Sequence, residues 1–238
     1  MNPLARRPNA IGRQALSLYD GAPRTERVHV GVRWWSAPFR QIEAALPKTG
    51  RILEIGCGHG LFCAYAALSC EGRQLHGTDI DAAKISHAQR AAQALPGRLS
   101  FAVAQSGQIP PGPWDAIVII DVLYLLTADE QHRLLADALK QLRPGGRLLV
   151  KEMATKPVWK VRWNQFQETL AVKVLRITEG RELTFVPSEE LASGLVQLGA
   201  DTKLKRLDKG RMHAHQLLIA QLKPQDSSTA PSSYPESA

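Results

Sequence analysis

Three glycines recur at every second position directly after a short β-type run. In the stretch LEIGCGHG, the carboxylate of Glu54 is followed by Gly56, Gly58 and Gly60. A glycine turn between a strand and a helix lets a ligand approach the main chain, whose N–H groups point at it. The dinucleotide pattern G-x-G-x-x-G would need a further glycine where the chain has Leu61. The spacing therefore predicts a ligand cradle and disfavours a nicotinamide-dependent oxidoreductase.

A second carboxylate follows at the end of the next β-type run. In the stretch QLHGTDIDAAKI, Asp79 closes the run and Asp81 stands two residues later. In a parallel sheet, Asp79 would lie at the same edge as the glycine turn, where it could accept two hydrogen bonds from a ribose diol. Either aspartate could instead cap the following helix. We assign the cap to Asp81 and the ribose to Asp79.

Short β-type runs alternate with helical stretches along most of the chain. The spacing predicts strands over 51–55, 74–78, 99–104, 115–120, 147–152, 202–207 and 216–222. It predicts helices over 61–70, 81–95, 127–142 and 189–198. Thr127 and Glu130 form a capping box at the start of the third helix. Because alternating strands and helices build mostly parallel sheets covered on both faces, we expect a three-layer α/β/α fold.

The two ends of the chain and one internal segment depart from this alternation. Residues 1–26 predict a basic, partly disordered arm with a short helix near 11–19, unless the arm folds over a site. Residues 27–223 predict a single domain, and residues 224–238, rich in Ser and Pro, a disordered tail. Within 156–176 the aromatic residues share one helical face. This inserted amphipathic helix either packs on the core or covers a site.

The net charge of +8 is concentrated on the flanks, above all at the N-terminus. Residues 1–51 hold nine Lys and Arg against three acidic residues. Such an excess suits an anionic partner, and a merely solvated basic surface is equally compatible with it. No uncharged apolar run approaches the roughly 18 residues of a membrane span, and no secretory signal is recognisable. We therefore expect a cytoplasmic protein without a transmembrane segment, with peripheral membrane contact left open.

Four motifs stand in one order and spacing: LEIGCGHG at 53–60, GTDID at 77–81, WDAIVIIDVLYLL at 114–126 and LRPGGRLLVKE at 142–152. With these motifs the chain resembles the class I S-adenosylmethionine-dependent methyltransferases. The resemblance implies a Rossmann-like fold with a seven-stranded, mostly parallel sheet and an antiparallel last strand. It also implies S-adenosyl-L-methionine as the cofactor.

The resemblance further implies which residues near the glycine turn hold the cofactor. Glu54 and Gly56 would line its methionine end. Gly58 and Gly60 would let it lie against the turn. Asp79 would hold the ribose, in agreement with the interpretation reached from its position.

The adenine side and the acceptor side follow from the same resemblance. Ile80 would flank the adenine. Where the family commonly carries an acidic residue for the adenine amino group, this chain has AVAQSGQIP, so Gln105 or Ser106 must substitute. Asp121 and Tyr124 correspond to positions that border the sulfonium and the acceptor in similar enzymes.

A base that removes the acceptor proton should stand on the same rim. The ends of the fourth and fifth strands meet there, together with the start of an antiparallel last strand. The candidates are Asp121, Tyr124, Lys151, Glu152, His213 and His215. Because histidine titrates near neutrality, His215 is the first choice and Glu152 the second, although for each histidine taken singly the pattern favours a surface or strand-end role. The HAH triplet lacks a third ligand at metal-binding spacing, so we predict no metal site.

The acceptor is less sharply defined than the cofactor. After the predicted fourth strand the chain reads DVLY, without the prolines of enzymes that methylate base amino groups. Aromatic residues within 27–39 and 156–176 predict a hydrophobic pocket near a basic entrance. The prediction is a small apolar or aromatic acceptor, free or linked to a carrier protein or a lipid, with no stable nucleic-acid partner. An RNA methyltransferase and a non-catalytic S-adenosylmethionine-binding module remain alternatives, and no feature indicates an oligomeric state.

Overall fold

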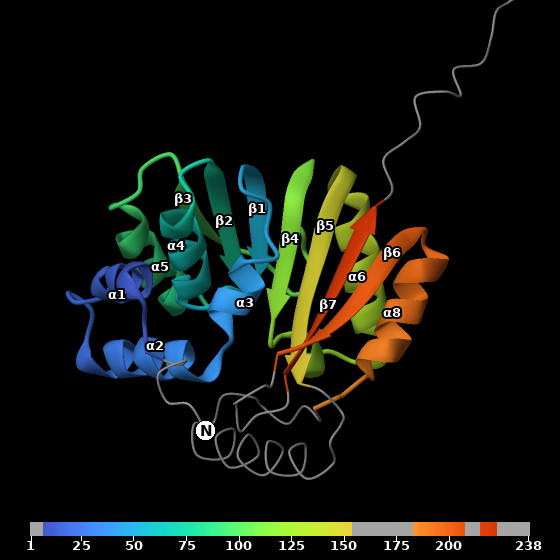
Figure 1. Cartoon of the computed structure of the whole chain (residues 1–238). Helices are drawn as coiled ribbons and strands as arrows, with labels where there is room; N and C mark the ends of the chain where they lie inside the picture. The colour runs from blue at the N-terminus through green and yellow to red at the C-terminus, as the bar shows by residue number, and fades with distance from the viewer. Residues whose placement is uncertain (1–6, 154–182, 208–214, 223–238) are drawn as a thin grey trace, which may run out of the picture.

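The computed structural model describes residues 7–153, 183–207 and 215–222 (Figure 1). Three predictions from the sequence lie outside these residues: the inserted helix over 156–176, the role of His213 and the disordered tail over 224–238. Among the described residues, no helix is both long enough and apolar enough to cross a membrane.

Seven strands form one sheet in the order β3-β2-β1-β4-β5-β7-β6. The strands are β1 Gly50–Ile55, β2 Arg73–Asp79, β3 Leu99–Val103, β4 Trp114–Ile120, β5 Leu142–Met153, β6 Ala200–Arg206 and β7 His215–Leu222. The first five run parallel to one another, whereas β7 pairs antiparallel with both β5 and β6. The predicted fold class, including the antiparallel last strand, is confirmed.

Helices cover both faces of the sheet (Figure 1). They are α1 Ala10–Ser17, α2 Arg24–Ser36, α3 Phe39–Glu43, α4 Leu61–Ser69, α5 Ala82–Ala92, η2 Leu123–Leu125, α6 Ala128–Lys140 and α8 Ser188–Gln197. Successive residues of β1 point to opposite faces: Ile52 joins the apolar core under α1, α4 and α5, and Leu53 the core under α6 and α8. This alternation produces the predicted three layers.

The predicted caps are present at atomic detail. The Asp81 carboxylate accepts hydrogen bonds from the backbone N–H groups of Ala83 and Lys84 at the start of α5. At the start of α6, the Thr127 hydroxyl accepts from the Glu130 N–H, while the Glu130 carboxylate accepts from the Thr127 N–H. Both helices therefore begin where their sequence signals indicate.

The N-terminal region is the part that the sequence described least well. The helix expected near 11–19 is present as α1, but α2 and α3 were not predicted. α2 runs across the domain boundary expected after residue 26. The side chain of Tyr19 is buried, and its hydroxyl donates to the main-chain carbonyl of His59 at 2.6 Å. The described part of the arm is thus folded against the glycine turn.

Candidate functional site

The glycine turn follows β1 at the carboxyl edge of the sheet. Gly56, Gly58 and Gly60 all have positive φ angles of 73°, 55° and 74°, which glycine adopts without a steric penalty. A Cβ atom on Gly56 would lie 2.3 Å from Val122, and one on Gly60 would lie 2.3 Å from Phe101. A Cβ atom on Gly58 would meet nothing within 4 Å. Packing explains two of the glycines, whereas Gly58 alone faces open space that a ligand could fill.

Asp79 connects the end of β2 to this turn. Its carboxylate accepts a hydrogen bond from the Gly58 N–H at 2.7 Å and another from the Asp81 N–H at 2.9 Å. Because each carboxylate oxygen offers two acceptor sites, both oxygens keep capacity for a ribose hydroxyl. Asp79 therefore shapes the turn in addition to the ribose role that the sequence predicts for it.

Glu54 lies buried beneath the turn, near the end of β1. The thiol of Cys63 donates to its carboxylate at 2.9 Å. Burial raises the pKa of Glu54 to about 7, against the lowering influence of the Cys63 hydrogen bond and the Arg33 cation. The charge of this carboxyl group is therefore sensitive to a positively charged ligand group placed beside it.

Apolar side chains are exposed at the ends of β2 and β3. Ile80 follows β2, and Val103 ends β3 in register with Asp79. Beyond Val103, Gln105 and Ser106 are exposed, and the Gln105 N–H donates to the Gln108 side chain at 3.1 Å. The position of Ile80 is compatible with contact to an adenine ring, and both Gln105 and Ser106 remain candidates for its amino group.

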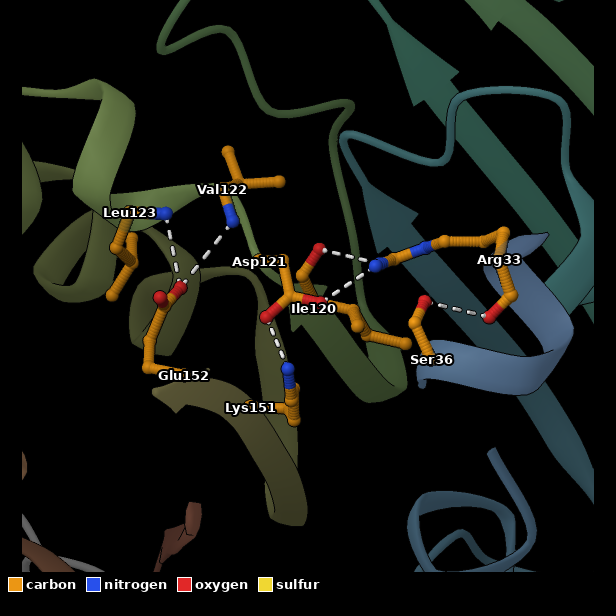
Figure 2. A network of polar contacts seen from close by, with 8 residues as sticks. All are labelled: Arg33, Ser36, Ile120, Asp121, Val122, Leu123, Lys151 and Glu152. Carbon is orange, nitrogen blue, oxygen red and sulfur yellow. Dashed lines mark hydrogen bonds and ion pairs between the residues drawn. The ribbon is translucent and has the colours of Figure 1, made fainter. Parts of the chain in front are cut away.

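A network of charged side chains joins the ends of β4 and β5 to α2 (Figure 2). Asp121 accepts a hydrogen bond from Arg33 of α2 at 2.6 Å through one oxygen and from Lys151 of β5 through the other. Arg33 also donates to the carbonyl of Ile120 at 3.3 Å. Burial alone would raise the pKa of Asp121, but Lys151 and Arg33 outweigh it and hold that pKa well below its usual range. The carboxylate predicted to border the sulfonium is thus ionised and fixed by two cations.

Glu152 lies beside this network but contacts different groups. One oxygen of its carboxylate accepts from the backbone N–H groups of Val122 at 3.3 Å and Leu123 at 3.0 Å (Figure 2). Burial, reinforced by the negative charge of Asp121, raises the pKa of Glu152 to about 8. Near neutral pH this side chain is mostly protonated and can exchange its proton within the range in which enzymes work.

His215 and Tyr124 complete the rim. His215 is buried at the start of β7, opposite Met153, and its charge would lower the pKa of Asp121. Tyr124 stacks on Phe185, with ring centroids 5.6 Å apart and an interplanar angle of 18°. The candidate residues of the acceptor side are therefore brought to one edge of the sheet, with roles that remain predictions.

Sequence reasoning missed the contribution of α2. Arg33 lies 88 residues before its partner Asp121, so no local pattern links them. At the other end of the helix, Glu26 contacts His59 of the glycine turn at 2.5 Å. The only sequence signal was the basic and aromatic character of residues 27–39, which we interpreted as pocket walls and not as a helix fastened to the site.

The comparisons with known proteins agree with this geometry. Residues 53–148 match the family described as "Methyltransferase domain". They form a class I S-adenosylmethionine-dependent methyltransferase domain. The motifs that predicted this family, from the glycine turn to the end of β5, lie in or next to the matched segment.

Individual relatives extend the likeness of the methyltransferase domain to most of the chain. A ubiquinone/menaquinone biosynthesis C-methyltransferase UbiE from Methylobacterium nodulans is 30% identical over 153 residues, which make up 62% of this chain and 60% of that protein. An O-methyltransferase family protein from Burkholderia thailandensis has a TM-score of 0.68 at 18% identity, covering 93% of this chain and 66% of that one.

A third likeness is to a structure with a bound cofactor product. Magnesium protoporphyrin IX methyltransferase from Synechocystis PCC 6803, solved with bound SAH, has a TM-score of 0.61 at 18% identity, covering 90% of this chain and 96% of that one. Both structural matches show a shared fold. Because this chain spans 60% of the length of the UbiE relative, the acceptor does not follow from the family.

The first prediction concerns Asp79, the carboxylate that we predict to hold the ribose. Asp79→Asn keeps one oxygen that can accept the Gly58 N–H but loses the charge and the second acceptor. We expect it to weaken S-adenosylmethionine binding by about 1 to 3 kcal/mol, measured by calorimetric titration. Asp81→Asn is the matched control, because asparagine caps a helix as well as aspartate does. Equal affinities for the two variants and the wild type would remove Asp79 from the ribose site.

Proposed function

We propose that the protein transfers a methyl group from S-adenosyl-L-methionine to a small apolar or aromatic acceptor. One observation carries the cofactor half of the proposal: the open space at Gly58, beside the acceptor oxygens of Asp79. The residues present fit an adenosyl group, since polar acceptors stand at the turn and the apolar Ile80 is exposed next to them. Glu54 would face the methionine end, which carries an amino group.

The proposed acceptor is a flat, largely apolar ring. Tyr124, which follows β4, stacks on Phe185, which precedes α8. Aromatic faces of this kind bind planar apolar groups by stacking. The UbiE relative is named for methylation in quinone biosynthesis, which supports a lipid-linked ring as the acceptor class. A carrier-linked aromatic group is the second form of the same acceptor.

The cofactor supplies an electrophilic methyl group when bound, so the chain must align the acceptor and receive its proton. Asp121, fixed between Arg33 and Lys151, cannot take a proton near neutral pH because its pKa is held low. Glu152, whose pKa is about 8, can take one as its carboxylate form becomes populated. His215 at the start of β7 is the other proposed proton acceptor, with Tyr124 orienting the ring.

A transfer assay tests this function. The full chain is incubated with methyl-labelled S-adenosylmethionine and, in separate reactions, with quinol or phenolic lipids, carrier-linked aromatic groups and RNA. We expect label in the ring-containing lipid or carrier fraction. Label in RNA would show that the acceptor is RNA and not a ring-containing small molecule. Cofactor binding without label in any fraction would identify a binding module instead of an enzyme.

The proton acceptor is tested by the pH dependence of the rate. Glu152→Gln keeps an oxygen for the two backbone N–H groups but cannot bind the proton. If Glu152 is the base, the wild-type kcat rises with pH through about 8, and the variant loses this rise together with about 10²- to 10⁴-fold in kcat. His215→Gln is the comparison. A normal profile for Glu152→Gln with loss of activity for His215→Gln would assign the role to the histidine.

A further inference from the structure

Two sides of α2 are used inside the molecule. Glu26 contacts His59 and Arg33 contacts Asp121, and these two residues lie seven positions apart on one side of the helix. Val30 and Trp34, four positions apart, are buried in the apolar core. The helix is therefore held in a fixed orientation along the carboxyl edge of the sheet, next to the candidate site (Figure 1).

The third side of α2 is apolar and exposed. Val28 and Val32 are each 59% exposed, and Trp35 is 48% exposed. Their spacing of four and three residues places them in one row on the helix surface. A Cβ atom on Gly31, which lies beside this row, would meet nothing within 4 Å. We call Val28, Val32 and Trp35 the apolar stripe of α2.

Positive charge flanks the stripe. Arg24 precedes Val28 by four residues and so continues the same row. Arg27, three residues after Arg24, lies next to Arg24 on the helix surface. Both arginines are exposed. Residues 1–51 as a whole hold nine Lys and Arg against three acidic residues. A helix that exposes an apolar row ending in tryptophan, with arginines along its border, has the character of one that lies in a membrane interface.

We propose that the apolar stripe of α2 docks the protein on the surface of an anionic lipid membrane. The side chains of Val28, Val32 and Trp35 enter the headgroup layer, and Arg24 and Arg27 contact lipid phosphates. Because the opposite side of α2 is fastened to the glycine turn and to Asp121, docking brings the candidate site to the lipid surface. The functional role of this docking rests on the proposed function, because a membrane surface would supply a lipid-linked acceptor.

The test is co-sedimentation of the full chain with vesicles of phosphatidylcholine and phosphatidylglycerol at 7:3, and with phosphatidylcholine alone. We expect binding to the mixed vesicles that weakens as salt rises. Val28→Ser combined with Val32→Ser should lower the vesicle partition coefficient by about tenfold. The matched control is Val196→Ser combined with Leu198→Ser, two side chains of 53% exposure at the end of α8, and it should bind like the wild type.

The charge contribution has its own pair of variants. Arg24→Glu with Arg27→Glu should reduce binding by more than about tenfold, since each basic residue near an anionic surface contributes about fivefold. Arg133→Glu with Lys203→Glu, both exposed on other elements, is the control. Equal sedimentation of wild type with and without vesicles would overturn the inference. Normal vesicle binding by the stripe variant would also overturn it. So would a wild-type protein that is dimeric without vesicles and a stripe variant that is monomeric, because the stripe would then be a dimer interface.

The vesicle assay contains neither cofactor nor acceptor. Binding without methyl transfer would therefore support the docking surface while contradicting the proposed function. Methyl transfer by a protein that does not bind vesicles would support the proposed function while contradicting the docking surface.

Discussion

We expect Gly58→Val to prevent measurable S-adenosylmethionine binding while the sheet stays folded. The structure gives the reason: the side of Gly58 on which a side chain would stand is open, and the neighbouring Asp79 carboxylate points its acceptors to the same turn. A valine side chain would fill the space that we assign to the cofactor. We expect the affinity to fall by more than about hundredfold, or roughly 2.7 kcal/mol, in a calorimetric titration.

A second effect must be separated from the first, because Gly58 has a φ angle of 55° and a valine there is strained. Gly97 provides the control. It has a φ angle of 72°, a Cβ atom on it would also meet nothing within 4 Å, and it lies at the amino end of β3. Gly97→Val should therefore show a similar loss of thermal stability with unchanged affinity. Normal binding by Gly58→Val would show that the turn is not the cofactor cradle.

Much of the fold could be predicted because its signals are local. The β-type run at Glu54, the glycine turn after it and the helix caps at Asp81 and Thr127 are each recognised from a few consecutive residues. In parallel strands the carboxyl ends share one edge, so chain order alone places Asp79 and Asp121 on the same side of the sheet. These inferences need no knowledge of packing.

The parts that could not be predicted depend on contacts between distant residues. In α2, three valines and two tryptophans lower the helix propensity, and the exposed apolar stripe disturbs the pattern by which a surface helix is recognised. Arg33 and its partner Asp121 are separated in the sequence by four strands, β1 to β4. Likewise, the sequence pattern of Gly60 suggests only contact with a ligand. In the fold, the Phe101 side chain packs so closely against it that a Cβ atom would not fit.

The second large effect is expected from Asp121→Ala. Lys151 has only 1% of its side chain exposed, and Asp121, at 13%, is its ion-pair partner. Removing one member of a buried pair leaves an uncompensated charge, so we expect the free energy of unfolding to fall by about 3 to 5 kcal/mol. Arg33 adds less to this loss because a third of its side chain already contacts solvent. Chemical denaturation measures the difference.

The matched control replaces both charges with apolar groups of similar size. Asp121→Leu combined with Lys151→Met removes the attraction and the burial cost together, so it should recover much of the stability. Asp121 has a φ angle of 57°, and both Ala and Leu are strained there, so this strain is common to the two variants. A double variant as unstable as Asp121→Ala would mean that backbone strain or packing, and not charge, explains the loss.

The pH dependence distinguishes the two buried carboxyl groups, because their pKa values are shifted in opposite directions. The folded-state pKa of Asp121 is depressed, so its stabilisation is present above its unfolded pKa of about 4 and is lost as the pH falls further. Asp121→Ala should lack this acid-sensitive segment. The folded-state pKa of Glu152 is raised to about 8, so between about pH 4 and pH 8 the unfolded state loses this proton while the folded state keeps it, and stability falls as the pH rises.

These two groups are coupled through Lys151, and the coupling predicts how the defect of Asp121→Ala changes with pH. Without Asp121, the repulsion that helps to raise the pKa of Glu152 disappears, while the attraction of Lys151 for Glu152 remains. Glu152 then ionises at lower pH and becomes the new partner of Lys151. The stability lost in Asp121→Ala should therefore be smaller at pH 8 than at pH 5, and adding Glu152→Gln should abolish this recovery. A defect that is constant between these pH values would show that the two carboxyl groups act independently.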